Sequence, residues 1–199
     1  KMMAAIQNKI GTTLIEDLPI RFTAVAADIA SEKEHWFQSG PIDQAIRASV
    51  SLPLFFTPYT VDGVQLIDGG ILNPTPIEPT LGDDTDLTIA VDLGGPMMEE
   101  LIPEVEEAKS PWQQKMDDFL ESMRFSKSKS TDQWDMLYIA DQSFNTMQNA
   151  IARIRMADNP PDHLIAIPRN KCGTLEFDRS TEMIEYGYRL AAEQLAGSL

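Results

Sequence analysis

One carboxylate stands out as a residue that could do chemistry, because of what lies on both sides of it. Asp68 follows the apolar pair Leu66-Ile67 and precedes Gly69-Gly70. A short strand that ends at an acid followed by two glycines places the carboxylate at a sharp turn with room beside it. Such an acid can act as a general base if its surroundings hold it near a substrate proton and tune its pKa. A plain turn with a solvated aspartate is the simpler interpretation of these residues taken alone.

The remaining nucleophiles and bases form no recognisable catalytic motif. The sequence contains no Gly-x-Ser-x-Gly, which is the signature of the serine turn in α/β hydrolases. Ser49 and Ser51 lie near the end of an expected helix, where hydrogen bonding to the local backbone is the ordinary role of serine. His163 would complete a triad with Ser49 and Asp68 in hydrolase chain order, but no local pattern supports it.

Three aspartates at the ends of expected strands allow a different chemistry: Asp28, Asp68 and Asp92. If these strand ends meet at one edge of a sheet, the carboxylates could together bind a metal ion. Considered separately, Asp28 and Asp92 are ordinary helix caps or turn formers. No cysteine pair or histidine group has the spacing of a metal site, so we expect no metal and no other cofactor. A metal-dependent hydrolase that uses the three aspartates nevertheless remains an alternative hypothesis.

Composition limits the class of protein and its partners. The 199 residues fit one domain, and 43% hydrophobic with 24% charged residues is ordinary for a globular protein with a core. A net charge of −15 argues against nucleic acid and against binding to anionic lipid by charge. One cysteine, Cys172, excludes an internal disulfide and fits a cytoplasmic location. No apolar run approaches the roughly 20 residues that cross a bilayer.

The elements that must position these residues alternate between strands and helices. Expected strands cover residues 20–29, 35–37, 64–67, 87–93 and 163–168. Expected helices cover residues 2–10, 40–50, 111–123, 135–156 and 180–195. The nearly all-apolar second half of 20–29 is typical of a parallel strand covered on both faces. We therefore expect a three-layer α/β domain over 1–199, with a mainly parallel sheet, helices on both faces and a helical insertion around 97–160.

The residues around Asp68 resemble the patatin-like phospholipase family. That family carries an Ala-Ser…Pro…Phe-x-Pro segment, followed by Asp-Gly-Gly or Asp-Gly-Ala, an apolar pair, Asn and Pro. The matching residues here are Ala48-Ser49, Pro53, Phe56, Pro58, Asp68-Gly69-Gly70, Asn73 and Pro76. Similar flanking segments are Pro19–Phe22, Ala26–Asp28, Ser39–Pro41 and Ala90–Leu93. The resemblance runs from about residue 14 to residue 95 and resumes in the last strand and helix.

The resemblance implies a phospholipase or carboxylesterase that uses a Ser–Asp dyad without histidine. Asp68 takes the position of the dyad aspartate and would accept the serine proton, after which water hydrolyses the acyl-enzyme. The glycines beside it would let substrate and the nucleophile turn approach closely. The family's serine turn and glycine-rich oxyanion loop precede this region, and neither is present. Because residue 1 is Lys and opens in an expected helix, we expect the C-terminal part of such a domain, inactive alone.

The resemblance also sets the expected partners. We expect a lipid or carboxylic ester substrate, transient contact with a membrane and no nucleic acid. A missing central strand would leave a sheet edge unpaired, so we expect self-association or pairing with the missing N-terminal segment. A non-catalytic interaction module that kept the fold and lost the chemistry is the second hypothesis.

Overall fold

The computed structural model describes residues 11, 13–53, 55–98, 136–173 and 176–196. Contacts divide the chain into two compact units, Lys1–Ala90 with Phe144–Asp162, and Val91–Ser143 with His163–Leu199. Strands and helices alternate along the described residues, which confirms the α/β class predicted from the sequence. A single domain with an insertion at 97–160 stays a prediction. The helices expected at 2–10 and 111–123 lie outside the described residues.

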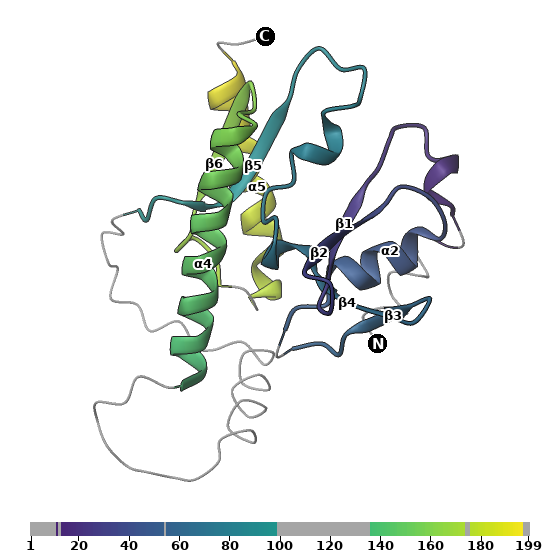
Figure 1. Ribbon diagram of the computed structural model, residues 1–199. Coiled ribbons are helices and arrows are strands. Elements are labelled where there is room, and N and C mark those ends of the chain that lie inside the picture. Colours follow the sequence, from purple (N-terminus) through teal and green to yellow (C-terminus); the bar gives the residue numbers. More distant parts are fainter. Residues whose placement is uncertain (1–10, 12, 54, 99–135, 174–175, 197–199) are drawn as a thin grey trace. The chain divides into compact units, whose positions relative to one another are not determined.

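Four short strands form the sheet of the first unit, in the order β2-β1-β4-β3 (Figure 1). Their bounds are Ala24–Asp28 for β1, Lys33–Phe37 for β2, Tyr59–Val61 for β3 and Val64–Asp68 for β4. Strand β1 pairs antiparallel with both β2 and β4, and β3 pairs antiparallel with β4. The mainly parallel pairing expected from the sequence is therefore corrected for this sheet, and β3 is a strand that the sequence analysis did not predict.

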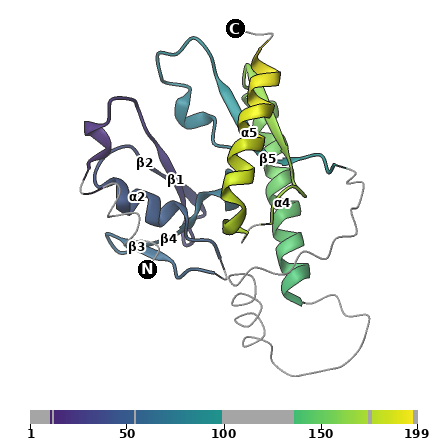
Figure 2. The same ribbon diagram turned by 180° about the vertical axis from the view of Figure 1, so that it is seen from behind.

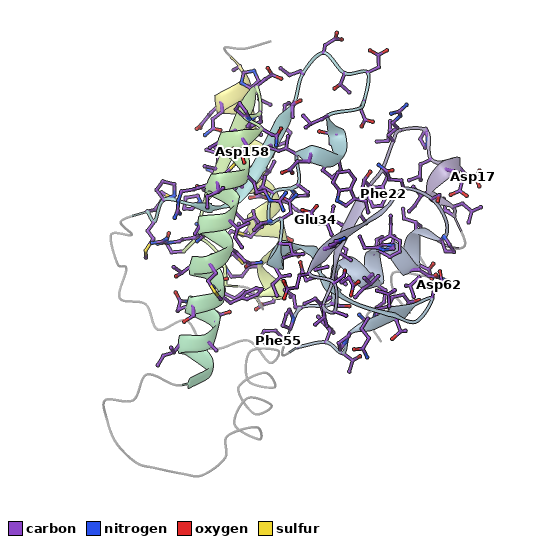
Figure 3. All side chains as sticks on the ribbon, in the orientation of Figure 1. Asp17, Phe22, Glu34, Phe55, Asp62 and Asp158 are labelled. Carbon is purple, nitrogen blue, oxygen red and sulfur yellow. The ribbon has the colours of Figure 1, made fainter. Side chains whose placement is uncertain are left out.

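Short connections explain the antiparallel pairing. Strands β3 and β4 are joined by Asp62-Gly63, whose φ angles of 49° and 83° are typical of a two-residue hairpin turn. Figure 3 labels Asp62 at this turn. Strands β1 and β2 are joined by the four residues 29–32, and a chain that reverses over so few residues must pair antiparallel. The apolar run in β1 has another cause: β1 is an inner strand, and Ala24 to Ala27 are all buried.

Helix α2 (Ile42–Ser49) packs on β1 and β4. Ala45 and Ala48 of this helix have no exposed surface, and neither has Ala26 of β1. Alanines on both sides let the helix backbone approach the sheet closely, so Ser49 and the turn after it lie beside the end of β4.

The second sheet consists of β5 (Ile89–Gly95) and β6 (His163–Pro168), and α5 (Ser180–Leu195) contacts β6 (Figure 2). Strand β5 lies two residues later than the predicted 87–93. The last two residues of β5 are Gly94 and Gly95. A Cβ on Gly95 would lie 2.6 Å from the carbonyl oxygen of Ile167. Glycine is therefore required here by the close approach of β6.

Helix α4 (Met136–Asp158) is predicted nearly residue for residue, although its packing is not. Met147 and Ile154 of this helix are 57% and 64% exposed, while Ala152 is 2% exposed. The described elements are completed by four 3-10 turns: η1 (Ile15–Asp17), η2 (Gly69–Ile71), η3 (Glu78–Thr80) and η4 (Phe177–Arg179). Among the described helices, none combines the length and the apolar character needed to cross a membrane.

Candidate active site

Asp68 is the last residue of β4, and hydrogen bonds fix its backbone and one of its carboxylate oxygens. Its backbone N–H donates to the carbonyl oxygen of Ser51 at 3.0 Å, and its register partner on β1 is Ala26. The N–H of Gly70 donates to Asp68 Oδ1 at 2.7 Å, which caps η2. Within the described part of the chain, Oδ2 has no hydrogen-bond partner. Oδ2 is therefore the oxygen that is available to a substrate proton.

An open hollow of about 330 Å³ lies in front of Asp68, near the lower end of the volumes of small-molecule sites. Its walls come from the start of β1, the end of α2 and the segment that follows β4. Its lining includes Phe22, Val25, Ser49, Asp68, Gly69 and Asn73. Asp68 is the one ionisable side chain among the described residues that line it. The site thus offers a single carboxylate in a largely apolar surround.

The two aspartates at the ends of β1 and β4 have opposite electrostatic surroundings. Burial raises the pKa of the Asp68 carboxyl above its usual value, and the hydrogen bond from Gly70 offsets this only in part. The Ser31 hydroxyl and the Ala30 N–H lower the pKa of the exposed Asp28 carboxyl. A carboxylate with a raised pKa in a hollow is typical of a general base, whereas Asp28 behaves as a turn residue.

The two glycines after Asp68 are explained by space and not by backbone freedom. A Cβ on Gly69 would lie 2.6 Å from the carbonyl carbon of Val25 and closer still to its oxygen, so β1 fills the position. A Cβ on Gly70 would lie 2.8 Å from Gln148 Nε2 and 3.0 Å from Asp68 Oδ1. The glycines were expected to make room for substrate. In the structure they make room for β1, for the Asp68 carboxylate and for helix α4.

A partly buried polar network includes Asn73, which lines the hollow. Asn73 is 2% exposed, and its Nδ2 donates to Glu78 Oε2 at 2.9 Å and to Glu34 Oε2 at 3.3 Å. Arg155 of α4 pairs with Glu34 at 2.7 Å and with Glu78 at 3.0 Å; Figure 3 labels Glu34. Burial acts to raise the pKa of Glu78, but hydrogen bonds, chiefly from Asn73, outweigh it and hold this pKa below its usual value. Asn73 Oδ1 is buried and has no hydrogen-bond partner among the described residues.

The serines and the histidine considered as partners of Asp68 lie in different surroundings. The Ser51 hydroxyl donates to the Arg47 carbonyl oxygen at 2.8 Å and accepts from the Arg47 guanidinium, and Ser51 is fully buried. Ser51 is therefore occupied as a structural residue. Ser49 lines the hollow together with Asp68. His163 is the first residue of β6, and the triad with Ser49 and Asp68 gains no support.

The aspartate trio proposed for a metal ion is not supported either. The carboxylate of Asp28 accepts hydrogen bonds from Ala30 and Ser31 in its own turn, and Asp92 accepts one from the N–H of Gly94 at 2.9 Å. In the parts of the chain that the structure describes, no three His, Cys, Asp or Glu side chains are placed to hold a metal ion.

Residues of α4 and β2 that support the turn were missed from the sequence. Gln148 Nε2 donates to the carbonyl oxygen of Gly70 at 2.9 Å, and Arg155 reaches two glutamates. These partners are 78, 77 and 121 residues apart in the chain. No local pattern in a single sequence signals contacts at that separation.

Comparisons with known proteins agree with the motif around Asp68. A family model described as patatin-like phospholipase matches residues 2–81. An uncharacterized NTE family protein of Mycobacterium tuberculosis is 33% identical over 245 residues, which cover 98% of this chain and 68% of the relative. An NTE family protein of Mycobacterium bovis matches equally. Lysophospholipase NTE1 of Cryptococcus neoformans is 27% identical over 188 residues, covering 92% of this chain and 11% of that protein.

Proposed function

The chain belongs to the patatin-like phospholipase family, and on this premise we propose that it forms part of a lipid acyl hydrolase in which Asp68 is the general base. A protein that is similar to 92% of this chain is called a lysophospholipase, which supports acyl esters of phospholipids or lysophospholipids as the substrate class. The observation that carries the proposal is the carboxylate itself. Asp68 is the one ionisable group among the described lining of the hollow, with Oδ1 fixed by Gly70 and Oδ2 free.

The proposed reaction has two halves that use the same carboxylate. In the first, Asp68 Oδ2 accepts the proton of a serine hydroxyl while the serine oxygen attacks the ester carbonyl carbon, and the proton then passes to the departing alcohol. In the second, Asp68 takes a proton from water, the hydroxide attacks the acyl-enzyme and the proton returns to the serine oxygen as the free acid leaves. The raised pKa of Asp68 suits both transfers, because a base with a higher pKa binds the proton more strongly.

We propose that the serine comes from a segment outside these 199 residues. Three observations support this. The sequence contains no Gly-x-Ser-x-Gly, and Ser51 is fully buried with its hydroxyl bonded to the Arg47 carbonyl oxygen. The mycobacterial relative is also longer than the part of it that matches this chain. This chain alone should then not hydrolyse esters. We also propose that the full-length enzyme acts in the cytoplasm, because a single cysteine fits a reducing compartment.

Exposed apolar residues support the proposed association with another segment or a second copy, and transient contact with a membrane. Val91 and Leu93 alternate along β5 and are 54% and 70% exposed. Alternate residues of a strand lie on the same face. This face of β5 is therefore apolar and uncovered within the described residues.

The test is p-nitrophenyl ester hydrolysis by the full-length protein and its Asp68→Asn variant. Asn keeps the hydrogen bond from Gly70 but cannot accept the serine proton, so kcat should fall by about 100-fold or more. Asp28→Asn is the matched control, because it removes an exposed carboxylate that caps a turn; its kcat should stay within about twofold of wild type. An unchanged rate in the Asp68→Asn variant would exclude Asp68 as the base. Absence of turnover in the wild-type full-length protein would favour the non-catalytic module.

A further inference from the structure

Helix α4 reaches the Asp68 turn through one side chain. Gln148 Nε2 donates to the carbonyl oxygen of Gly70 at 2.9 Å. A Cβ built on Gly70 would lie 2.8 Å from this nitrogen and 3.0 Å from Asp68 Oδ1. The Gln148 carboxamide and the Asp68 carboxylate therefore both lie beside Gly70, and together they occupy the space that a side chain at residue 70 would need.

The face of α4 that carries Gln148 is held from two further points. Residues 148, 152 and 155 follow the i, i+4, i+7 spacing of one helix face. Ala152 is 2% exposed, so this face is packed, and Arg155 pairs with Glu34 at 2.7 Å and Glu78 at 3.0 Å. Figure 3 labels Glu34, one of the two carboxylates that Arg155 binds. The buried Ala152, one turn after Gln148, and the ion pairs of Arg155, two turns after it, therefore fix the position of Gln148 along the helix axis.

The geometry points to Gln148 as a positioning residue for Asp68: a neutral hydrogen-bond donor that holds Gly70 so that its N–H keeps Asp68 Oδ1 fixed and Oδ2 open to the hollow. The inference rests on the proposed role of Asp68 as the base and assigns a part in it to helix α4. A glutamine suits the position, because its amide nitrogen donates to Gly70 while adding no charge beside a carboxylate that must ionise. A glutamate of the same shape would have no donor when ionised and would repel Asp68.

Three charged side chains on the neighbouring elements have partners elsewhere. Arg47 of α2 binds Ser51 and the Thr57 carbonyl oxygen, and Arg155 of α4 binds Glu34 and Glu78. Asp28 of β1 is exposed in its own turn. The pKa of Asp68 is shifted by burial and by the Gly70 N–H, with no contribution from a charged neighbour. A new charge at residue 148 would therefore act on an otherwise uncharged surround.

The test follows the Gly70 amide resonance by NMR during a pH titration, since this N–H donates to Asp68 Oδ1 and reports its ionisation. In Gln148→Glu, the midpoint should rise by about one pH unit relative to wild type. Gln142→Glu places the same charge at an exposed position of α4, and its midpoint should stay near wild type. Equal midpoints for the two glutamate variants would overturn the positioning role.

A neutral variant separates positioning from simple folding. Gln148→Met keeps the length of the side chain and removes the donor. We expect faster exchange of the Gly70 amide and, in the full-length enzyme, a kcat lowered about tenfold at unchanged KM, with melting temperature near wild type. Normal exchange and normal kcat in a folded Met variant would also overturn the role. The NMR result stands without catalysis, so a positive titration with an inactive or Asp68-independent enzyme would refute the base and not the contact.

Discussion

Replacing Gly69 by alanine should disrupt the turn that carries Asp68. A Cβ at this position would lie 2.6 Å from the carbonyl carbon of Val25 and closer still to its oxygen, and ordinary contact begins at 3.4 Å, so β1 and the turn must separate by at least about 0.8 Å. The obstructing atoms are backbone atoms of an inner strand, which no rotamer change can move. Overpacking of this kind costs about 1–3 kcal/mol, and weakening the β1–β4 hydrogen bonds adds roughly 1 kcal/mol each.

The expected loss is therefore about 3 kcal/mol in the free energy of unfolding, which corresponds to a fall of about 6–12 °C in Tm for a chain of this size. Differential scanning calorimetry of Gly69→Ala measures it. Gly82→Ala is the matched control, because a Cβ there would meet nothing within 4 Å, and its Tm should change by no more than about 2 °C. Equal melting temperatures for the two variants would refute the packing of Gly69 against β1.

Two further predictions concern the ionisation of Asp68 and the ion pairs of Arg155. Because the folded pKa of Asp68 is raised, ionising it costs stability above its unfolded pKa; Asp68→Asn should therefore increase the stability at pH 7, and a lower Tm in this variant would contradict the assignment. Arg155→Gln leaves Glu34 and Glu78 without their cation and should destabilise by about 1–2 kcal/mol, whereas Arg153→Gln, on the exposed side of α4, should stay within about 0.5 kcal/mol in urea unfolding.

The elements near Asp68 were predictable where the signal was local. A strand that ends at Asp68 was expected from the apolar residues before it and the glycines after it, and β4 ends there. The hairpin before it had a local signal as well, since Asp-Gly is a favoured hairpin turn. The Asp62-Gly63 pair was nevertheless not used to predict β3.

Strand direction and the supporting contacts could not be obtained in the same way. The apolar run Ala24–Ala27 fits a parallel strand and an inner antiparallel strand equally, because both are buried on two faces. Gln148 and Arg155 act through partners 77 to 121 residues away, and each is an ordinary polar residue of a helix when read from sequence. Met147 and Ile154 of α4 are exposed, and the helix is held through polar side chains on another face.

If Asp68 is the base, the pH dependence of kcat/KM of the full-length enzyme should follow the ionisation of Asp68. The acid limb of that profile reports the pKa of the essential base in the free enzyme. We expect a limb centred above the ordinary aspartate value of 3.8. Gln148→Glu should move this limb to higher pH, and Asp68→Asn should remove it together with most of the rate. A limb that remains in place, with full activity, in the Asp68→Asn variant would contradict this role of Asp68.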